Sequence, residues 1–180
     1  VDPGETDPTL ADTDGDSIND DLDNCPVTSN QDQQNTDVDL SQQPDSLVLG
    51  DGLGDACDPD DDNDLLDDLD EDPNQDGIID PTETDPLDPD SDSDGVIDGP
   101  DNCPLTSSVD QTDTDNDGEG NACDLDDDND GLSDIDENDQ NTDSLVADTD
   151  GDGIGDLADN CPIDDNFNQL NTDLELSQEP

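Results

Sequence analysis

The sequence contains no lysine, no arginine and no histidine among its 180 residues. Without cations it cannot clamp phosphate groups, which excludes nucleic-acid binding, and anionic membrane surfaces would repel it. The missing histidine and lysine leave few side chains suited to general-base catalysis. No apolar run approaches the length of a membrane-spanning helix. We therefore expect no nucleic-acid partner, no membrane insertion in this segment and no enzymatic activity.

Aromatic and apolar side chains are also scarce. Phe167 is the one aromatic residue, and sixty acidic residues give a net charge of −60. A bare chain of this kind cannot bury enough apolar surface to offset the entropy of ordering its backbone. The sequence thus predicts either a disordered chain or one that a bound ligand orders.

The five cysteines are predicted to form structural disulfide bonds and not to act as redox catalysts. A reactive thiolate needs an electropositive setting, which this chain does not offer. Cysteines in a chain with so small a core are typical of proteins from an oxidising compartment.

Internal repeats organise the whole sequence. Residues 2–25 superpose without gaps on 80–103, and 57–71 superpose on 123–137. Such self-similarity indicates a repeat architecture. We predict one array over residues 1–180 with no internal domain boundary, continuing beyond both ends of this sequence.

The acidic residues fall at positions 1, 3, 5, 9 and 12 of a twelve-residue window that usually has glycine at position 6. This spacing is typical of a calcium loop, in which positions 1, 3, 5, 9 and 12 offer side-chain oxygens and position 7 offers its carbonyl. Zinc would favour histidine or thiolates, and Mg²⁺ a tighter octahedron. The uninterrupted windows are 12–23, 60–71, 72–83, 90–101, 113–124, 126–137 and 148–159.

Each window supplies a set of predicted calcium ligands, with at least one ion expected per loop. The sets are Asp12, Asp14, Asp16, Ile18, Asp20 and Asp23; Asp60, Asp62, Asp64, Leu66, Asp68 and Glu71; Asp72, Asn74, Asp76, Ile78, Asp80 and Glu83; Asp90, Asp92, Asp94, Val96, Asp98 and Asp101; Asp113, Asp115, Asp117, Glu119, Asn121 and Asp124; Asp126, Asp128, Asp130, Leu132, Asp134 and Glu137; and Asp148, Asp150, Asp152, Ile154, Asp156 and Asp159.

Two further loops are incomplete. Asp2 and Glu5 match positions 9 and 12 of a loop whose first half is missing. In the other loop, about twelve extra residues separate Asn35 and Asp37 from Asp55 and Asp58. Either Asp39 or Asp51 could fill its position 5.

Several details of the loops stay open at this point. The windows 72–83 and 126–137 match the spacing best, whereas Ser17 and Leu65 replace the turn glycine and predict weaker or distorted loops. Asp124 stands between two windows and could bridge two ions. Asp127 and Asp136 are either solvated charges or ligands of a neighbouring ion.

Position 7 is apolar in six windows, and we expect these side chains to tuck under the turns and form the whole core. The alternative is a set of scattered, exposed aliphatics. The loops lack flanking ten-residue amphipathic stretches, which argues against a helix–loop–helix calcium sensor.

The chain resembles the thrombospondin type 3 repeat family. The motifs that carry this resemblance are DNCP at 23–26, 101–104 and 159–162, GDACD at 54–58, NACD at 121–124 and CPVTSNQDQ at 25–33. The resemblance implies little regular secondary structure, an elongated array of Asp-rich calcium loops stapled by disulfides, no conventional hydrophobic core, and a secreted or cell-surface protein. The ETDP punctuation at 5–8 and 83–86 is typical of bacterial members.

The resemblance also implies the disulfide pairs Cys25–Cys57 and Cys103–Cys123. On the chain-entropy model each would contribute roughly 3 kcal/mol to stability. The partner of Cys161 would then lie about 32 residues further along the chain. The alternative for Cys161 is a disulfide to another molecule.

The favoured function is a calcium-rigidified spacer, stalk or fibre segment of an extracellular, bacterial surface protein. The alternative is a module that binds an adhesion partner or a mineral through its calcium sites. The apolar runs SLVLG (46–50) and SLVA (144–147) either mediate contacts between copies in a filament or pack on neighbouring loops.

Overall fold

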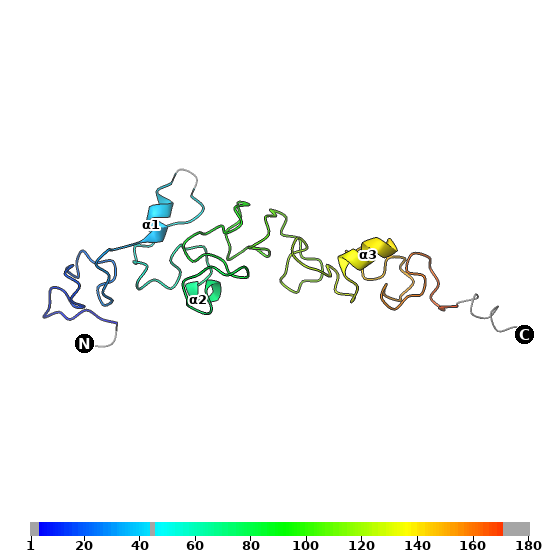
Figure 1. Ribbon diagram of the computed structural model, residues 1–180, viewed down its shortest axis with the longest axis horizontal. Coiled ribbons are helices and arrows are strands. Elements are labelled where there is room, and N and C mark those ends of the chain that lie inside the picture. Colours follow the sequence, from blue (N-terminus) through cyan, green and yellow to red (C-terminus); the bar gives the residue numbers. More distant parts are fainter. Residues whose placement is uncertain (1–3, 44–45, 171–180) are drawn as a thin grey trace, which may run out of the picture. The chain divides into compact units, whose positions relative to one another are not determined.

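The structure is a computed structural model that describes residues 4–43 and 46–170 (Figure 1). It contains three short helices, α1 (Thr36–Ser41), α2 (Asp68–Glu71) and α3 (Asp134–Gln140), joined by long loops. The described residues contain no strand, and none of their helices is long and apolar enough to cross a membrane. The prediction of little regular secondary structure is confirmed. Asp2, a predicted calcium ligand, lies outside the described residues.

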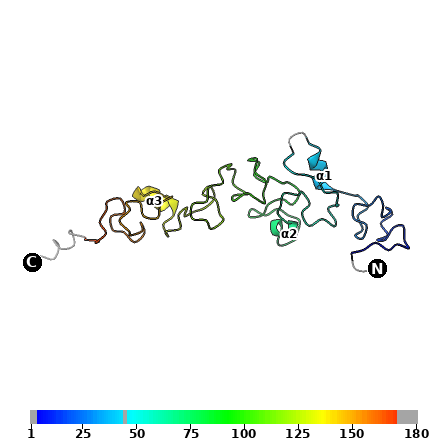
Figure 2. The ribbon, with the colours of Figure 1, turned by 180° about the vertical axis from the view of Figure 1, so that it is seen from behind.

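The chain forms two compact units, residues 1–109 and 110–180. The first contains α1 and α2, with α1 on a loop that stands out from the rest of that unit (Figures 1 and 2). The second contains α3. Cys25 and Cys57 form a disulfide within the first unit, as predicted. Cys103 and Cys123 are disulfide-bonded as well, as their predicted pairing requires, and Cys161 is free and exposed.

The helices are short because they form within the loops: α2 covers positions 9–12 of window 60–71, and α3 begins at position 9 of window 126–137. In α1 the Asn35 side chain accepts the Val38 backbone N–H, and in α3 the Ser133 side chain accepts the Asp136 N–H. Both are N-caps of the usual kind, and acidic residues in the first turns suit the helix dipole. Helices of four to seven residues are not stable alone, so they depend on the loops they adjoin.

The most deeply buried side chains are acidic. Asp62, Asp64 and Glu137 are fully buried, and Glu71 is 1% exposed. Among the described residues the buried apolar side chains are Cys25, Val48, Cys103 and Leu132. The core of this protein is therefore made mainly of carboxylates.

The prediction that position-7 aliphatics form the core is wrong. Leu132 alone among them is buried, Ile78 is 62% exposed, and the other four are half-buried: Ile18, Leu66, Val96 and Ile154. The physical reason is the size of the loop. A twelve-residue loop that turns its carboxylates inward has no second layer in which to enclose an aliphatic side chain.

Two positions of every window have left-handed backbone. At position 6, φ lies between 69° and 107° in all seven windows, and at position 4 it lies between 55° and 84°. Glycine adopts this region at no steric cost, and asparagine tolerates it. The residues at position 4 are Gly15, Asn63, Gln75, Ser93, Asn116, Asn129 and Gly151.

Leu65 holds position 6 at a φ of 83° although it is a leucine, and its side chain is 76% exposed. Because this conformation costs a non-glycine residue about 1 kcal/mol, we expect Leu65→Gly to stabilise the calcium-loaded chain by about that amount. The measurement is the denaturant midpoint at saturating calcium.

Leu125→Gly is the matched control, since Leu125 is also 76% exposed and is not among the residues with positive φ. It should lower stability, because glycine there only adds entropy to the unfolded chain. Equal losses in both variants would show that no strain is stored at Leu65.

Candidate metal centres

The position-1 carboxylate organises each loop through the backbone. In all seven windows its Oδ2 accepts the N–H of position 6, at 2.9–3.2 Å. The left-handed residues at positions 4 and 6 turn the intervening N–H groups toward it. In six windows the Oδ1 of the same carboxylate accepts a further N–H, from position 4 or 5. The position-1 carboxylate therefore fixes the shape of the loop through its backbone.

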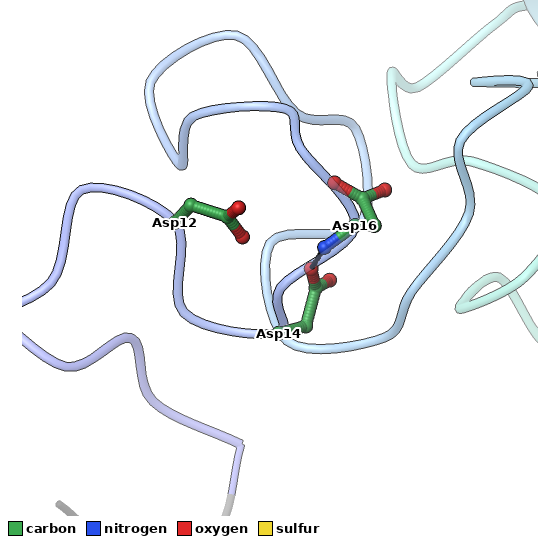
Figure 3. Close-up of side chains that lie close together, drawn as sticks. All are labelled: Asp12, Asp14 and Asp16. Carbon is green, nitrogen blue, oxygen red and sulfur yellow. Dashed lines mark hydrogen bonds between the residues drawn. The ribbon is translucent and has the colours of Figure 1, made fainter.

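The carboxylates of positions 3 and 5 also accept backbone N–H groups, each from the residue two positions later in the chain. The Oδ1 of position 5 accepts the N–H of position 7 in all seven windows. The Oδ1 of position 3 accepts the N–H of position 5 in six of them. Figure 3 shows the result for the first loop, where the carboxylates of Asp12, Asp14 and Asp16 face a common centre.

The second oxygen of position 3 has no such partner. It is buried and makes no hydrogen bond in five loops, at Asp14, Asp62, Asp92, Asp128 and Asp150. An unpaired buried carboxylate oxygen is costly. Its burial therefore points to a ligand that is a cation.

Position 12 supplies further oxygens of this kind, at Asp23, Glu71, Glu137 and Asp159. The carboxylates of positions 1, 3 and 5 place ligand atoms within 4.8 Å of one another in loops that include 12–23, 60–71 and 90–101; these sets are Asp12, Asp14, Asp16; Asp60, Asp62, Asp64; and Asp90, Asp92, Asp94. Several hard, negative oxygens around one centre fit calcium. The residues present thus fit the predicted ion.

The buried carboxyl groups hold protons more tightly than usual. The pKa of Asp62 is raised to about 9 and that of Glu71 to about 8. Burial is the main cause, neighbouring carboxylates add to it, and a hydrogen bond from Thr84 partly offsets it at Glu71. The pKa of Glu137 is raised to about 7, again mainly by burial.

These raised pKa values predict a pH dependence for the calcium-free chain. A carboxyl whose folded pKa is raised stabilises the folded loop at low pH, and this contribution is lost as the pH rises through the folded value. Between about pH 5 and pH 9, the calcium-free loop 60–71 should therefore lose amide-exchange protection, after correction for intrinsic exchange. Loop 72–83, whose Asn74, Asp76 and Asp80 are exposed, is the control in the same chain. An equal loss of protection in both loops would contradict the attribution of the pH dependence to the buried carboxyl groups of loop 60–71.

Position 9 has a different partner. Its side-chain oxygen accepts the backbone N–H of position 2 in six windows, in the pairs Thr13–Asp20, Asp61–Asp68, Ser91–Asp98, Thr114–Asn121, Asp127–Asp134 and Thr149–Asp156. An amide oxygen serves this contact as well as a carboxylate, which explains Asn121. The seventh window has Pro73 at position 2, which carries no N–H. That position 9 also binds metal within its own loop stays a prediction.

The two windows that match the consensus best differ in the structure. In 126–137, both oxygens of Glu137 are buried without a partner. In 72–83, the oxygens of Glu83 accept the Asn74 side-chain amide and the Asp80 backbone N–H, both at 3.0 Å. Loop 126–137 is therefore closed around its carboxylates, whereas 72–83 is open.

The interrupted loop closes through Asp51. Asp37, Asp51 and Asp58 place ligand atoms within 4.8 Å of one another. The Asp51 N–H donates to Asp37 Oδ2 at 2.7 Å, and the Leu53 N–H donates to Asp51 Oδ1 at 2.7 Å, which are the bonds of positions 3, 5 and 7. Thr36 N–H donates to Asp55, as position 2 does to position 9 elsewhere.

Asp39 lies instead in α1 and is exposed. The structure therefore places Asp51 and not Asp39 at position 5. Asp37 is 1% exposed, and its Oδ1 is buried without a partner, so this discontinuous loop has the same features as the continuous ones.

Of the two residues left over in loop 126–137, Asp127 is 7% exposed and its Oδ1 has no partner. Asp136 is exposed and accepts the Ser133 hydroxyl. Asp61 occupies the same position in loop 60–71 as Asp127 does in 126–137, and its environment is similar. The pKa of Asp61 is raised to about 8, mainly by burial and then by the nearby Asp68 carboxylate. Asp127 is thus the one of the two with features of a ligand.

Sequence reasoning missed the residues that support the ligands from outside the loops. The Asn30 N–H donates to Asp16 Oδ2 at 3.0 Å, and the Gln33 side-chain amide donates to Asp23 Oδ1 at 2.7 Å. Asn166 and Gln169 make the same bonds to Asp152 and Asp159 in the second unit. The signal available was the Asn-x-x-Gln that follows two of the three Cys-Pro pairs, those at 25–26 and 161–162.

Comparison with known families identifies a repeat family in four regions of the chain. The thrombospondin type 3 repeat matches residues 11–33, 70–111, 112–143 and 138–169, which together cover well over half of the sequence. No curated protein matches the chain.

Proposed function

This chain belongs to the thrombospondin type 3 repeat family, and we propose on that basis that it is a calcium-rigidified spacer, stalk or fibre segment of an extracellular, bacterial surface protein. Repeats of this family are calcium-binding structural repeats of extracellular proteins and do not form an enzyme family. The observation that carries the proposal is the set of buried carboxylate oxygens without hydrogen-bond partners at positions 3 and 12.

In each closed loop the carboxylates of positions 1, 3, 5 and 12 would hold the ion. A bound calcium supplies positive charge and oxygen coordination. The residues of the chain do the rest, because their backbone hydrogen bonds fix where each oxygen lies. Metal binding is then folding free energy. Such a chain would be ordered where calcium is abundant and flexible where calcium is scarce, which suits a segment that crosses a membrane before it folds.

Solution scattering tests the spacer proposal. We expect the calcium-loaded chain to give an elongated particle of constant dimensions, and chelation to broaden the distribution of distances. A compact, rounded particle in saturating calcium would contradict a spacer. Unchanged dimensions and circular dichroism after chelation would contradict calcium-dependent rigidity.

One observation favours a second candidate, contact with other copies or with an adhesion partner. In the insert 46–50, Val48 is buried but Leu47 and Leu49 are 51% and 85% exposed. Replacing both leucines by serine should leave calcium binding unchanged. If such contacts exist, this variant should abolish filaments seen by electron microscopy, or capture of a partner that depends on calcium.

A further inference from the structure

A carboxylate of one loop lies among the buried carboxylates of another. Asp64 and Glu71 belong to loop 60–71, and Asp98 is position 9 of loop 90–101. Their ligand atoms all lie within 4.8 Å of one another. The three residues are 0%, 1% and 3% exposed. This cluster is therefore sealed from solvent and joins two loops that are separate in sequence.

Asp98 and Glu71 each use one oxygen within the protein and leave the other unused. Asp98 Oδ1 accepts the Ser91 N–H at 2.9 Å, and its Oδ2 is buried without a partner. Glu71 Oε1 accepts the Thr84 hydroxyl at 3.0 Å, and its Oε2 is likewise buried without a partner. Two buried, unpaired carboxylate oxygens in one cluster call for a cation.

The backbones of the two loops also touch at this point. A Cβ added at Gly99 would lie 2.6 Å from the Asp64 carbonyl oxygen and 2.8 Å from the Leu65 carbonyl carbon. Both contacts are to backbone atoms, which cannot move aside as a side chain can. Glycine at 99 thus permits the approach that brings Asp98 to Asp64 and Glu71.

We propose that the cation of loop 60–71 takes Asp98 of loop 90–101 as a further ligand, so that one calcium ion cross-links the two loops. This inference rests on the proposed calcium binding of loop 60–71. Its consequence is coupling. Calcium uptake by loop 60–71 orders loop 90–101 with it, and each loop raises the affinity of the other by the same factor.

The second unit contains a related contact. The Leu157 N–H, from loop 148–159, donates to Asp130 Oδ2 of loop 126–137 at 3.3 Å. Position 9 of that loop is Asp156, but both of its oxygens accept bonds from Thr149. The cross-link through a free position-9 oxygen is therefore proposed for the first unit alone.

The test is Asp98→Asn in the full chain, titrated with calcium chloride and followed by amide hydrogen exchange. Asparagine keeps the bond to position 2, because Asn121 already makes it with Thr114. The matched control is Asp20→Asn, since both oxygens of Asp20 are occupied by Thr13. Asp98→Asn should raise the calcium midpoint for protection of loop 60–71 by about ten-fold or more, whereas Asp20→Asn should leave that midpoint unchanged.

Gly99→Ala tests the approach of the loops without changing charge, and should raise the same midpoint in loop 60–71. If Asp98→Asn alters protection only within 90–101, the cross-link is wrong while calcium binding stands. Absence of any calcium-dependent protection in the unmodified chain would overturn the proposed function itself. The two failures are therefore distinguishable.

Discussion

Removal of calcium from the full chain at pH 9 is expected to abolish the ordered loops of both units. The described core consists mainly of carboxylates, with four buried apolar residues, so little apolar burial remains to hold the chain when the ions leave. The net charge of −60 then favours expansion. Amide protection should fall to the level of an unfolded chain throughout residues 60–101 and 126–159, as measured by hydrogen exchange before and after chelation.

Two controls make this result specific. Adding back calcium should restore protection, whereas an equal concentration of Mg²⁺ should not, because Mg²⁺ demands a tight octahedron and keeps several waters. A monovalent salt at the same ionic strength tests simple screening. Recovery with the monovalent salt alone would mean that the carboxylates need only a diffuse counterion atmosphere and not bound metal.

Asp62→Asn should have the largest effect of any single substitution in loop 60–71. Asp62 is fully buried, one of its oxygens accepts the Asp64 N–H at 3.2 Å, and the other has no partner. The amide keeps the backbone bond but removes one charge from the ligand set. We expect the calcium midpoint for this loop to rise about a hundred-fold, measured by calorimetric titration together with hydrogen exchange.

Asp70→Asn is the matched control, because it makes the same change of charge in the same loop. Asp70 lies in α2 and is exposed, so its loss should shift the midpoint only through weakened long-range attraction. Equal shifts for the two variants would show that calcium is attracted by overall charge and not coordinated at position 62.

The spacing of acids in the sequence is enough to predict that the carboxylates of positions 1, 3 and 5 gather in each loop, because each makes its backbone bond at a fixed distance along the chain. Positions 1, 3 and 5 form backbone bonds two or five residues ahead, so their order in the chain determines where their oxygens lie. The Cys25–Cys57 disulfide is instead what the resemblance to the thrombospondin type 3 repeat family implied. Local chemistry of this kind can be read without a three-dimensional structure.

The rest depends on contacts that spacing does not encode. An acidic residue at position 9 is what the spacing requires of a metal ligand, but it is equally suited to accept a backbone N–H. In six windows the structure shows the second contact, in which the position-9 oxygen accepts the N–H of position 2. Asp98 lies close to Glu71 because residues 72–97 bring the chain back to loop 60–71. The spacing of acids within a single loop does not predict this long-range contact. The position-7 aliphatics failed as a predicted core because the pattern gives their order and not the space available to them.

The discontinuous loop, in which Asp37 and Asp51 occupy positions 3 and 5, indicates where such a chain tolerates inserted residues. The Asp51 N–H donates to Asp37, as position 5 donates to position 3 in the continuous loops, although the segment between the two residues contains most of α1. A metal centre built this way depends on its anchor points and tolerates the length of chain between them. The interval between Asp37 and Asp51 is accordingly a natural insertion point, into which a foreign peptide could be grafted and displayed while calcium closes the loop at its base.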